Sequence, residues 1–170
     1  MKTVLLMRHA KSDWGEPGLE DFDRPLNGRG LEDAPRMGRA LAKAGLVPDR
    51  IVASPARRAK QTAEIVAKSS GYHGEIAWEP ALYGAPGTVW LETIRKLPEK
   101  ATAVLFVAHS PGVGEAAALL LGGRGGRARL RFPTGAIACV ESTADRWDDV
   151  GPGEGELRWL LIPRVVKSIA

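Results

Sequence analysis

The feature that most constrains the fold is a set of short apolar runs that do not alternate with polar residues. Residues 3–7 (TVLLM) and 102–108 (TAVLFVA) are the clearest, and residues 51–53 (IVA) form a shorter run. A strand with one face in water alternates apolar and polar side chains, whereas continuous apolar strands are typical of parallel sheets covered by helices on both faces. We therefore predict an α/β fold with three layers, α/β/α, around a mostly parallel open sheet.

Helical spacing and turn residues predict further elements between these strands. Residues 27–44 carry apolar side chains at helical spacing, with Asn27 as N-cap and Gly45 beyond the end. The same signals predict a helix over 88–97 and strands over 75–78, 136–141 and 157–162. Because no helix separates the last two strands, we expect them to pair as an antiparallel hairpin at one edge of the sheet.

Two of the expected helices begin with the dipeptide Ser-Pro directly after a strand. Ser54 and Pro55 open a helix that ends before Gly71, and Ser110 and Pro111 open one that runs to about residue 121. Serine is a favoured N-cap, and proline is favoured at the first helical position. Both helices are therefore predicted to begin at the carboxyl end of a strand.

Length and composition place the chain among ordinary globular proteins. With 170 residues and a hydrophobic fraction of 44%, we expect a single domain over residues 1–170 that needs no disulfide or metal to fold. Cys139 is the only cysteine, and the apolar run near the N-terminus is too short for a signal peptide. We therefore expect a cytoplasmic location and no membrane partner. The net charge of +4 favours anionic ligands in general.

Basic side chains follow the predicted strands. Arg8 and His9 come directly after residues 3–7, His109 follows residues 102–108, and the second strand leads to Arg57 and Arg58. In open α/β sheets, ligands bind beyond the carboxyl ends of the strands. The sequence therefore predicts that these side chains meet at one edge of the sheet.

This set of side chains suits phosphoryl transfer. Cations in the first turn of a helix are disfavoured by its dipole, unless an anion binds there to free backbone N–H groups and guanidinium groups. A neutral imidazole is a competent nucleophile. We predict that one histidine attacks phosphorus in line and that water hydrolyses the resulting phosphohistidine while the arginines neutralise the phosphoryl oxygens. We expect no metal and no cofactor.

Four segments of the chain resemble motifs of the histidine phosphatase superfamily. They are RHA (residues 8–10), SPARRAKQT (54–62), VAHSP (107–111) and RPLNGRG (24–30). The resemblance covers nearly the whole chain, and its compact length is similar to that of the SixA-type phosphohistidine phosphatases. It implies a phosphoglycerate-mutase-like fold and a phosphatase activity.

The resemblance also implies roles for particular residues. His9 would be the phosphorylated nucleophile, and Arg8, Arg58 and His109 would bind the phosphoryl group. Arg57 precedes the position that matches the family pattern. The expected substrate is phosphohistidine on a protein, so the expected partner is a phosphorylated protein.

The chain departs from the family pattern at two points. Ala10 stands where the family usually has glycine, and its methyl group adds bulk to the loop. Larger relatives also carry a carboxylic acid that protonates the leaving group, and none matches cleanly here. The candidates are Glu79 and, in the loop 13–24, Asp13, Glu16, Glu20, Asp21 and Asp23. A missing acid matters less for phosphohistidine, because its leaving nitrogen is easier to expel than an alkoxide.

Three alternatives remain open at this point. The same residues suit a phosphatase or mutase acting on small phosphate esters, and they suit a catalytically weak module that binds phosphoproteins. The basic stretch over 122–131 resembles a nucleic-acid-binding segment, but such charge runs are usually exposed loops. We favour the loop and expect no nucleic acid partner.

Overall fold

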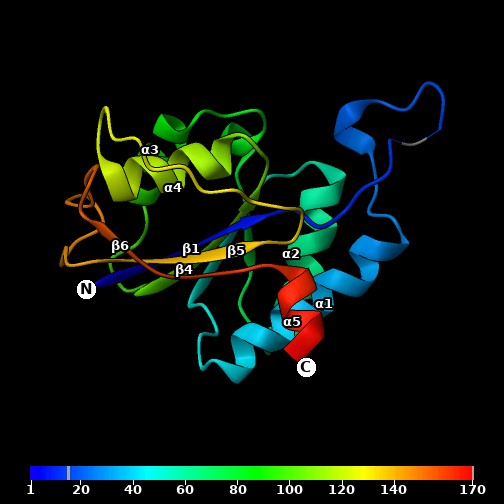
Figure 1. Ribbon diagram of the computed structural model, residues 1–170, viewed down its shortest axis with the longest axis horizontal. Helices are drawn as coiled ribbons and strands as arrows, with labels where there is room; N and C mark the ends of the chain where they lie inside the picture. The colour runs from blue at the N-terminus through cyan, green and yellow to red at the C-terminus, as the bar shows by residue number, and fades with distance from the viewer. Residues whose placement is uncertain (15, 170) are drawn as a thin grey trace.

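The computed structural model describes residues 1–14 and 16–169 and contains a six-stranded sheet with strand order β3-β2-β4-β1-β5-β6 (Figure 1). The strands are β1 (Lys2–Arg8), β2 (Arg50–Ala53), β3 (Ile76–Trp78), β4 (Ala103–Ala108), β5 (Ile137–Ser142) and β6 (Gly155–Leu161). The helices are α1 (Gly28–Lys43), α2 (Arg57–Ser70), α3 (Gly87–Arg95), α4 (Gly112–Gly122) and α5 (Pro163–Ile169), with short 3-10 turns at Asp21–Asp23 and Pro80–Leu82.

The sheet is mixed in the way that the sequence predicts. Strands β3, β2, β4 and β1 pair in parallel, whereas β5 pairs antiparallel with both β1 and β6. The β5–β6 hairpin therefore forms an antiparallel edge, as predicted. In the β1–β4 pair, Arg8 lies opposite Ala108, so the two strands end at the same level.

Helices cover both faces of the sheet, which explains the continuous apolar strands. Helices α3 and α4 lie on one face, and α1, α2 and α5 lie on the other (Figure 1). Leu6 and Phe106 pack with Trp90 of α3 in the first core cluster, whereas Leu5 packs with Met37 of α1 in the second. Successive residues of a strand point to opposite faces, so both sets must be apolar.

Two predicted helix starts are wrong, that of α2 by two residues and that of α4 by one residue. Ser54 is not the N-cap of α2, which begins at Arg57 because Ala56 still has extended backbone angles (φ −55°, ψ 136°). Likewise, α4 begins at Gly112, with Pro111 rather than Ser110 in the N-cap position. The Ser54 hydroxyl lies 2.8 Å from Nε2 of His109 and accepts from the backbone N–H of Ala56, so it does not cap the N–H groups of α2.

Helix α5 was not predicted from the sequence. It has seven residues, too few for helical spacing to stand out, and its only start signal is Pro163 at the first position. The expected N-cap of α1 is confirmed, because the side chain of Asn27 accepts a hydrogen bond from the backbone N–H of Gly30.

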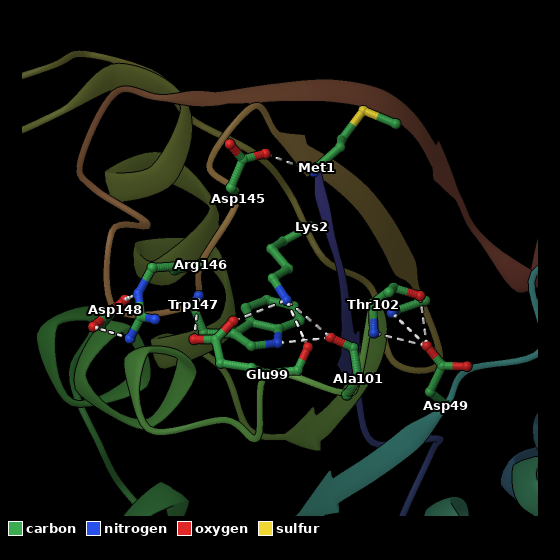
Figure 2. A network of polar contacts seen from close by, with 11 residues as sticks. Met1, Lys2, Asp49, Glu99, Ala101, Thr102, Asp145, Arg146, Trp147 and Asp148 are labelled. Atoms are coloured by element: carbon green, nitrogen blue, oxygen red, sulfur yellow. Dashed lines mark hydrogen bonds and ion pairs between the residues drawn. The ribbon is translucent and has the colours of Figure 1, made fainter.

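A polar network around Lys2 holds the edge of the sheet at which β1 begins (Figure 2). The buried Lys2 ammonium group forms an ion pair with Glu99 (3.1 Å) and donates to the carbonyl of Ala101 (3.2 Å). It also lies 5.1 Å from the ring centre of Trp147, whose indole N–H donates to the same Ala101 carbonyl. These contacts fix the start of β1 against the loop that precedes β4.

The basic stretch over 122–131 is a loop, as favoured from the sequence. Gly122 ends α4, and the residues after it have no regular secondary structure and expose their arginine side chains. Within residues 1–14 and 16–169, no helix is long and apolar enough to cross a membrane.

Candidate active site

The predicted site residues meet at the carboxyl edge of the sheet. His9 follows β1 and His109 follows β4, and because these strands are neighbours the two imidazole centres are 5.2 Å apart. Arg58, in the first turn of α2, places its Nε 3.3 Å from Nε2 of His9. Arg8, the last residue of β1, borders the same cavity.

The cavity has a volume of about 470 Å³ and is open to solvent. Its lining residues are Arg8, His9, Lys11, Ser12, Trp14, Asp21, Arg24, Arg58, Tyr83, Gly84, His109, Ser110 and Thr134. His9, Arg58 and His109 form its floor and are almost fully buried, whereas Trp14 and Tyr83 at its mouth are exposed. The cavity is therefore deep and cationic at the floor and partly aromatic at the mouth.

Two hydrogen bonds fix the orientation and the tautomer of the His9 ring. Its Nδ1 lies 2.7 Å from the carbonyl oxygen of Ala10, which can only accept, so we assign the proton to Nδ1. The lone pair of Nε2 then faces Arg58, which donates to it. In this tautomer Nε2 is the unprotonated nitrogen of the ring.

Burial keeps both histidines neutral. The pKa of His9 is lowered to about 3, first by burial and further by the nearby His109, Arg58 and Arg8. The hydrogen bond to Ala10 acts in the opposite direction, but its effect is smaller than these together. The pKa of His109 is lowered to about 4, again first by burial and next by Arg58. Both rings are therefore uncharged at neutral pH, which is the form that a nucleophilic His9 requires.

His109 is positioned by a residue whose role the sequence reasoning missed. Its Nε2 lies 2.8 Å from the hydroxyl oxygen of Ser54, which directly follows β2. The sequence predicts a helix cap for Ser54, whereas its place at a strand end is the signal that points to the site. Nδ1 of His109 is buried and has no hydrogen-bond partner among the described residues.

Arg8 also keeps an unused donor. Its Nη1 donates to the carbonyl of Phe132 (2.9 Å), whereas its Nε is buried without a partner among the described residues. Its pKa is lowered by burial and by the charge of Arg58. A buried, unpaired N–H costs free energy that an anion in the cavity would recover. The donors of Arg8 and Arg58 thus suit a group with several negative oxygens.

Arg58 is held on its outer side by Asp21. Its Nη1 donates to the Asp21 carbonyl (2.6 Å), and its Nη2 forms an ion pair with the Asp21 carboxylate (3.1 Å). The hydroxyl of Tyr83 donates to the same carboxylate oxygen (2.7 Å), and Nε of Arg24 donates to the other (3.0 Å). These hydrogen bonds, with that of Tyr83 first, lower the pKa of Asp21.

The other acidic candidates lie outside the cavity. Glu79 borders a separate groove beside β3, and its carboxylate accepts a hydrogen bond from the backbone N–H of Ala81. Asp13 and Glu16 border a third groove, together with the exposed Arg57. Glu20 and Asp23 are exposed and absent from the cavity lining.

Ala10 packs its methyl group in the core. It is fully buried in the second core cluster, and its backbone N–H donates to the hydroxyl oxygen of Thr62 in α2 (3.0 Å). Lys11, the next residue, passes so close to α1 that only a glycine fits at position 30. The loop after His9 is thus held by α1 and α2.

Comparisons with known proteins agree with this arrangement. Residues 4–83 match the family described as "Histidine phosphatase superfamily (branch 1)". An uncharacterised protein of Mycobacterium tuberculosis is 35% identical over 165 residues, which cover 93% of this chain and 100% of that protein.

Solved structures show the same fold over nearly the whole chain. The protein histidine phosphatase SixA complexed with tungstate has a TM-score of 0.82 and 26% identity, covering 96% of this chain and 99% of that one. A putative phosphohistidine phosphatase SixA from Agrobacterium tumefaciens has a TM-score of 0.79 and 26% identity, covering 95% and 98%.

Proposed function

The chain belongs to the histidine phosphatase superfamily and has its phosphoglycerate-mutase-like fold, and we propose that it removes phosphoryl groups from phosphohistidine on a protein. The observation that carries the proposal is the neutral His9, whose unprotonated Nε2 accepts from Arg58 at the floor of a cavity that Arg8 and His109 also line. The likeness to SixA, which binds the tetrahedral oxyanion tungstate, supports it.

In the proposed reaction, Nε2 of His9 attacks phosphorus in line with the bond to the leaving group. The His9–Ala10 hydrogen bond keeps the ring oriented and stabilises the positive charge that forms on it. Arg8 and Arg58 neutralise the phosphoryl oxygens, and the unpaired N–H of Arg8 supplies one of the donors. Water then attacks the phosphohistidine, which releases phosphate and restores His9.

His109 supplies a further hydrogen-bond donor at the floor of the cavity. With Nε2 accepting from the Ser54 hydroxyl, its Nδ1 carries the proton and is free to donate to a phosphoryl oxygen. A neutral His109 ring suits the reaction better than a protonated one, because a second positive ring would repel the His9 cation that forms in the first step. Guanidinium and imidazole groups thus supply the charge stabilisation that the reaction needs, and no step requires a metal.

Phosphohistidine is the favoured substrate because the site offers no acid for an alkoxide. Asp21 is the one carboxylate that lines the cavity among the described residues, and its pKa is lowered, so it is ionised and has no proton to give. An alkoxide leaves poorly without a proton, whereas the nitrogen of a phosphohistidine leaves as a neutral imidazole once its ring is protonated.

A labelled phosphoenzyme tests the proposal. The protein is mixed with phosphohistidine-bearing protein, phosphoserine peptide and sugar phosphates, with EDTA present, and the reaction is stopped in base. We expect turnover of the phosphohistidine substrate and a trapped phosphoryl group that is stable in base and labile in acid. His9→Ala should show neither. Full activity of His9→Ala, or faster turnover of sugar phosphates than of phosphohistidine, would overturn the proposal.

A further inference from the structure

The carboxylate of Asp21 lies at an unusual place for a site that binds anions. The cavity floor carries Arg8 and Arg58, yet Asp21 lines the same cavity and is its only carboxylate among the residues that the structure describes. Its side chain keeps 48% of its surface exposed, so it faces the open part of the cavity as well as Arg58. A phosphoryl group alone gains nothing from this negative charge.

The Asp21 carboxylate is held in place from three sides. Arg58 and Tyr83 donate to Oδ2, and Arg24 donates to Oδ1. Arg24 is itself buried and lies with its guanidinium carbon 4.2 Å from the ring centre of Trp14. Tyr83 is packed edge-on against Phe22 on one side and His109 on the other. The carboxylate is therefore a fixed part of the cavity wall.

The leaving group must lie on the side of the cavity where Asp21 is found. In-line attack by Nε2 of His9 places the leaving group on the far side of phosphorus, toward the cavity mouth. The exposed charged residues that line the cavity are Lys11 and Asp21, and Asp21 is the one of the two that can accept a hydrogen bond from a leaving group. A carboxylate has more acceptor positions than its three donors use, so it can accept one further hydrogen bond.

We propose that Asp21 is a specificity-determining residue that accepts a hydrogen bond from a cationic leaving group, the protonated imidazole of the substrate, and that disfavours anionic leaving groups. Tyr83 is a positioning residue that holds this carboxylate. The inference rests on the proposed function and extends it, because it states how the same site selects one class of phosphorylated compound.

The step balances without an acid from the protein. The lone pair of Nε2 of His9 forms the new N–P bond, and the P–N bond to the substrate breaks with its electron pair passing to the leaving nitrogen. The leaving ring already carries a proton on its other nitrogen, so it departs as neutral imidazole. The N–H of that second nitrogen donates to Asp21 before and during the step, which stabilises the protonated form that reacts.

Two small substrates of similar size test the inference. Phosphoimidazole releases imidazole, and p-nitrophenyl phosphate releases an anionic phenolate. The kcat/KM for each is measured in the wild type and in Asp21→Asn, and the ratio of the two values is the readout. We expect Asp21→Asn to lower the ratio of phosphoimidazole to p-nitrophenyl phosphate about tenfold, since a hydrogen bond to a charged group is lost. Tyr83→Phe should lower the ratio in the same direction but less.

Asp23→Asn is the matched control. Asp23 belongs to the same 3-10 turn and is exposed, but among the described residues its carboxylate has no hydrogen bond or ion pair, and it does not line the cavity. Its removal changes the net charge by the same amount, so the ratio should stay as in the wild type.

The outcomes separate this inference from the proposed function. Equal losses on both substrates in Asp21→Asn would show that Asp21 only orients Arg58, and the inference would be wrong while the proposed function stands. An unchanged ratio in Asp21→Asn, or the same change in Asp23→Asn, would also overturn it. A wild type that hydrolyses neither substrate would overturn the proposed function, and the inference with it.

Discussion

Nε of Arg58 lies 3.3 Å from Nε2 of His9, so a side chain in the first turn of α2 donates directly to the nitrogen that faces the cavity. The rest of its guanidinium group is held by Asp21. One arginine thus orients the ring of the proposed nucleophile and also presents positive charge to the cavity.

Replacing Arg58 should cost more than the loss of a positive charge. We expect Arg58→Ala to lower kcat/KM by about 100-fold or more, as for the loss of a positioned donor to a transition-state oxyanion. Arg58→Lys should recover only a small part, because an ammonium group cannot contact His9 and Asp21 at once. Steady-state kinetics with phosphoimidazole measures both. Arg57→Ala is the matched control, since Arg57 is exposed and outside the cavity; an equal loss there would contradict this prediction.

Burial of the two histidines should make the fold sensitive to acid. Their pKa values are lowered to about 3 for His9 and about 4 for His109, so the folded protein leaves them neutral where the unfolded chain protonates them. The unfolded form binds these protons below about pH 6.5, so the free energy of unfolding should fall as pH is lowered from there to about 4.

Urea unfolding at pH 7 and pH 4.5 checks this pH dependence. We expect His9→Asn to lose about 2 kcal/mol less than the wild type between the two pH values, because one group that resists protonation is gone. An identical loss in the variant and the wild type would show that His9 is accessible to protons in the folded state.

A methyl group at position 30 should disturb the loop that follows His9. A Cβ on Gly30 would overlap the carbonyl oxygen of Lys11, whereas a Cβ on Gly28, in the same first turn of α1, meets no atom within 4 Å. We expect Gly30→Ala to lower the free energy of unfolding by about 2 kcal/mol, the usual cost of overpacking. Gly28→Ala should stay within about 0.5 kcal/mol of the wild type. Similar urea midpoints for the two variants would contradict the close packing of Lys11 on α1.

The ion pair of Lys2 should matter for stability and not for activity. Lys2→Ala removes the buried ammonium group, its ion pair with Glu99 and its hydrogen bond to the Ala101 carbonyl, so we expect a loss of about 2 kcal/mol in the free energy of unfolding. Lys2→Met should lose less, because its side chain still packs on Trp147. Lys100→Ala, at an exposed neighbour, is the control. The kcat/KM of all three variants should match the wild type, because Lys2 and the site lie at opposite ends of β1.

The meeting of His9, Arg58 and His109 could be predicted because it depends on a topological rule. Their places after apolar strands are visible in the sequence, and parallel strands bring their carboxyl ends to one edge. The contact between Asp21 and Arg58 could not be predicted in the same way. It depends on how an acidic loop folds over the edge, and that loop has several acidic residues with nothing local to distinguish them.

The starts of α2 and α4 show that a Ser-Pro pair is not sufficient to predict the N-cap of a helix. Serine before proline is a good cap signal in general, but Ser54 instead places its hydroxyl against His109, and α2 starts later. A side chain with two possible partners cannot be assigned from its neighbours in sequence when one partner is 55 residues away. Helix α5 could not be predicted for a different reason: its seven residues are too few to show helical spacing of apolar side chains.

The hydrogen-bond register between β1 and β4 sets the spacing of His9 and His109, although a hundred residues of chain separate them. Because each histidine directly follows its strand, the spacing does not depend on the long surface segments in between. A protein engineer who exchanged the acidic stretch that includes Asp21, or the segment that carries Tyr83, would be changing the mouth of the cavity while the pair of imidazoles stayed where the sheet puts it. The scaffold is in this sense divided into a fixed reactive centre and a replaceable frame around it.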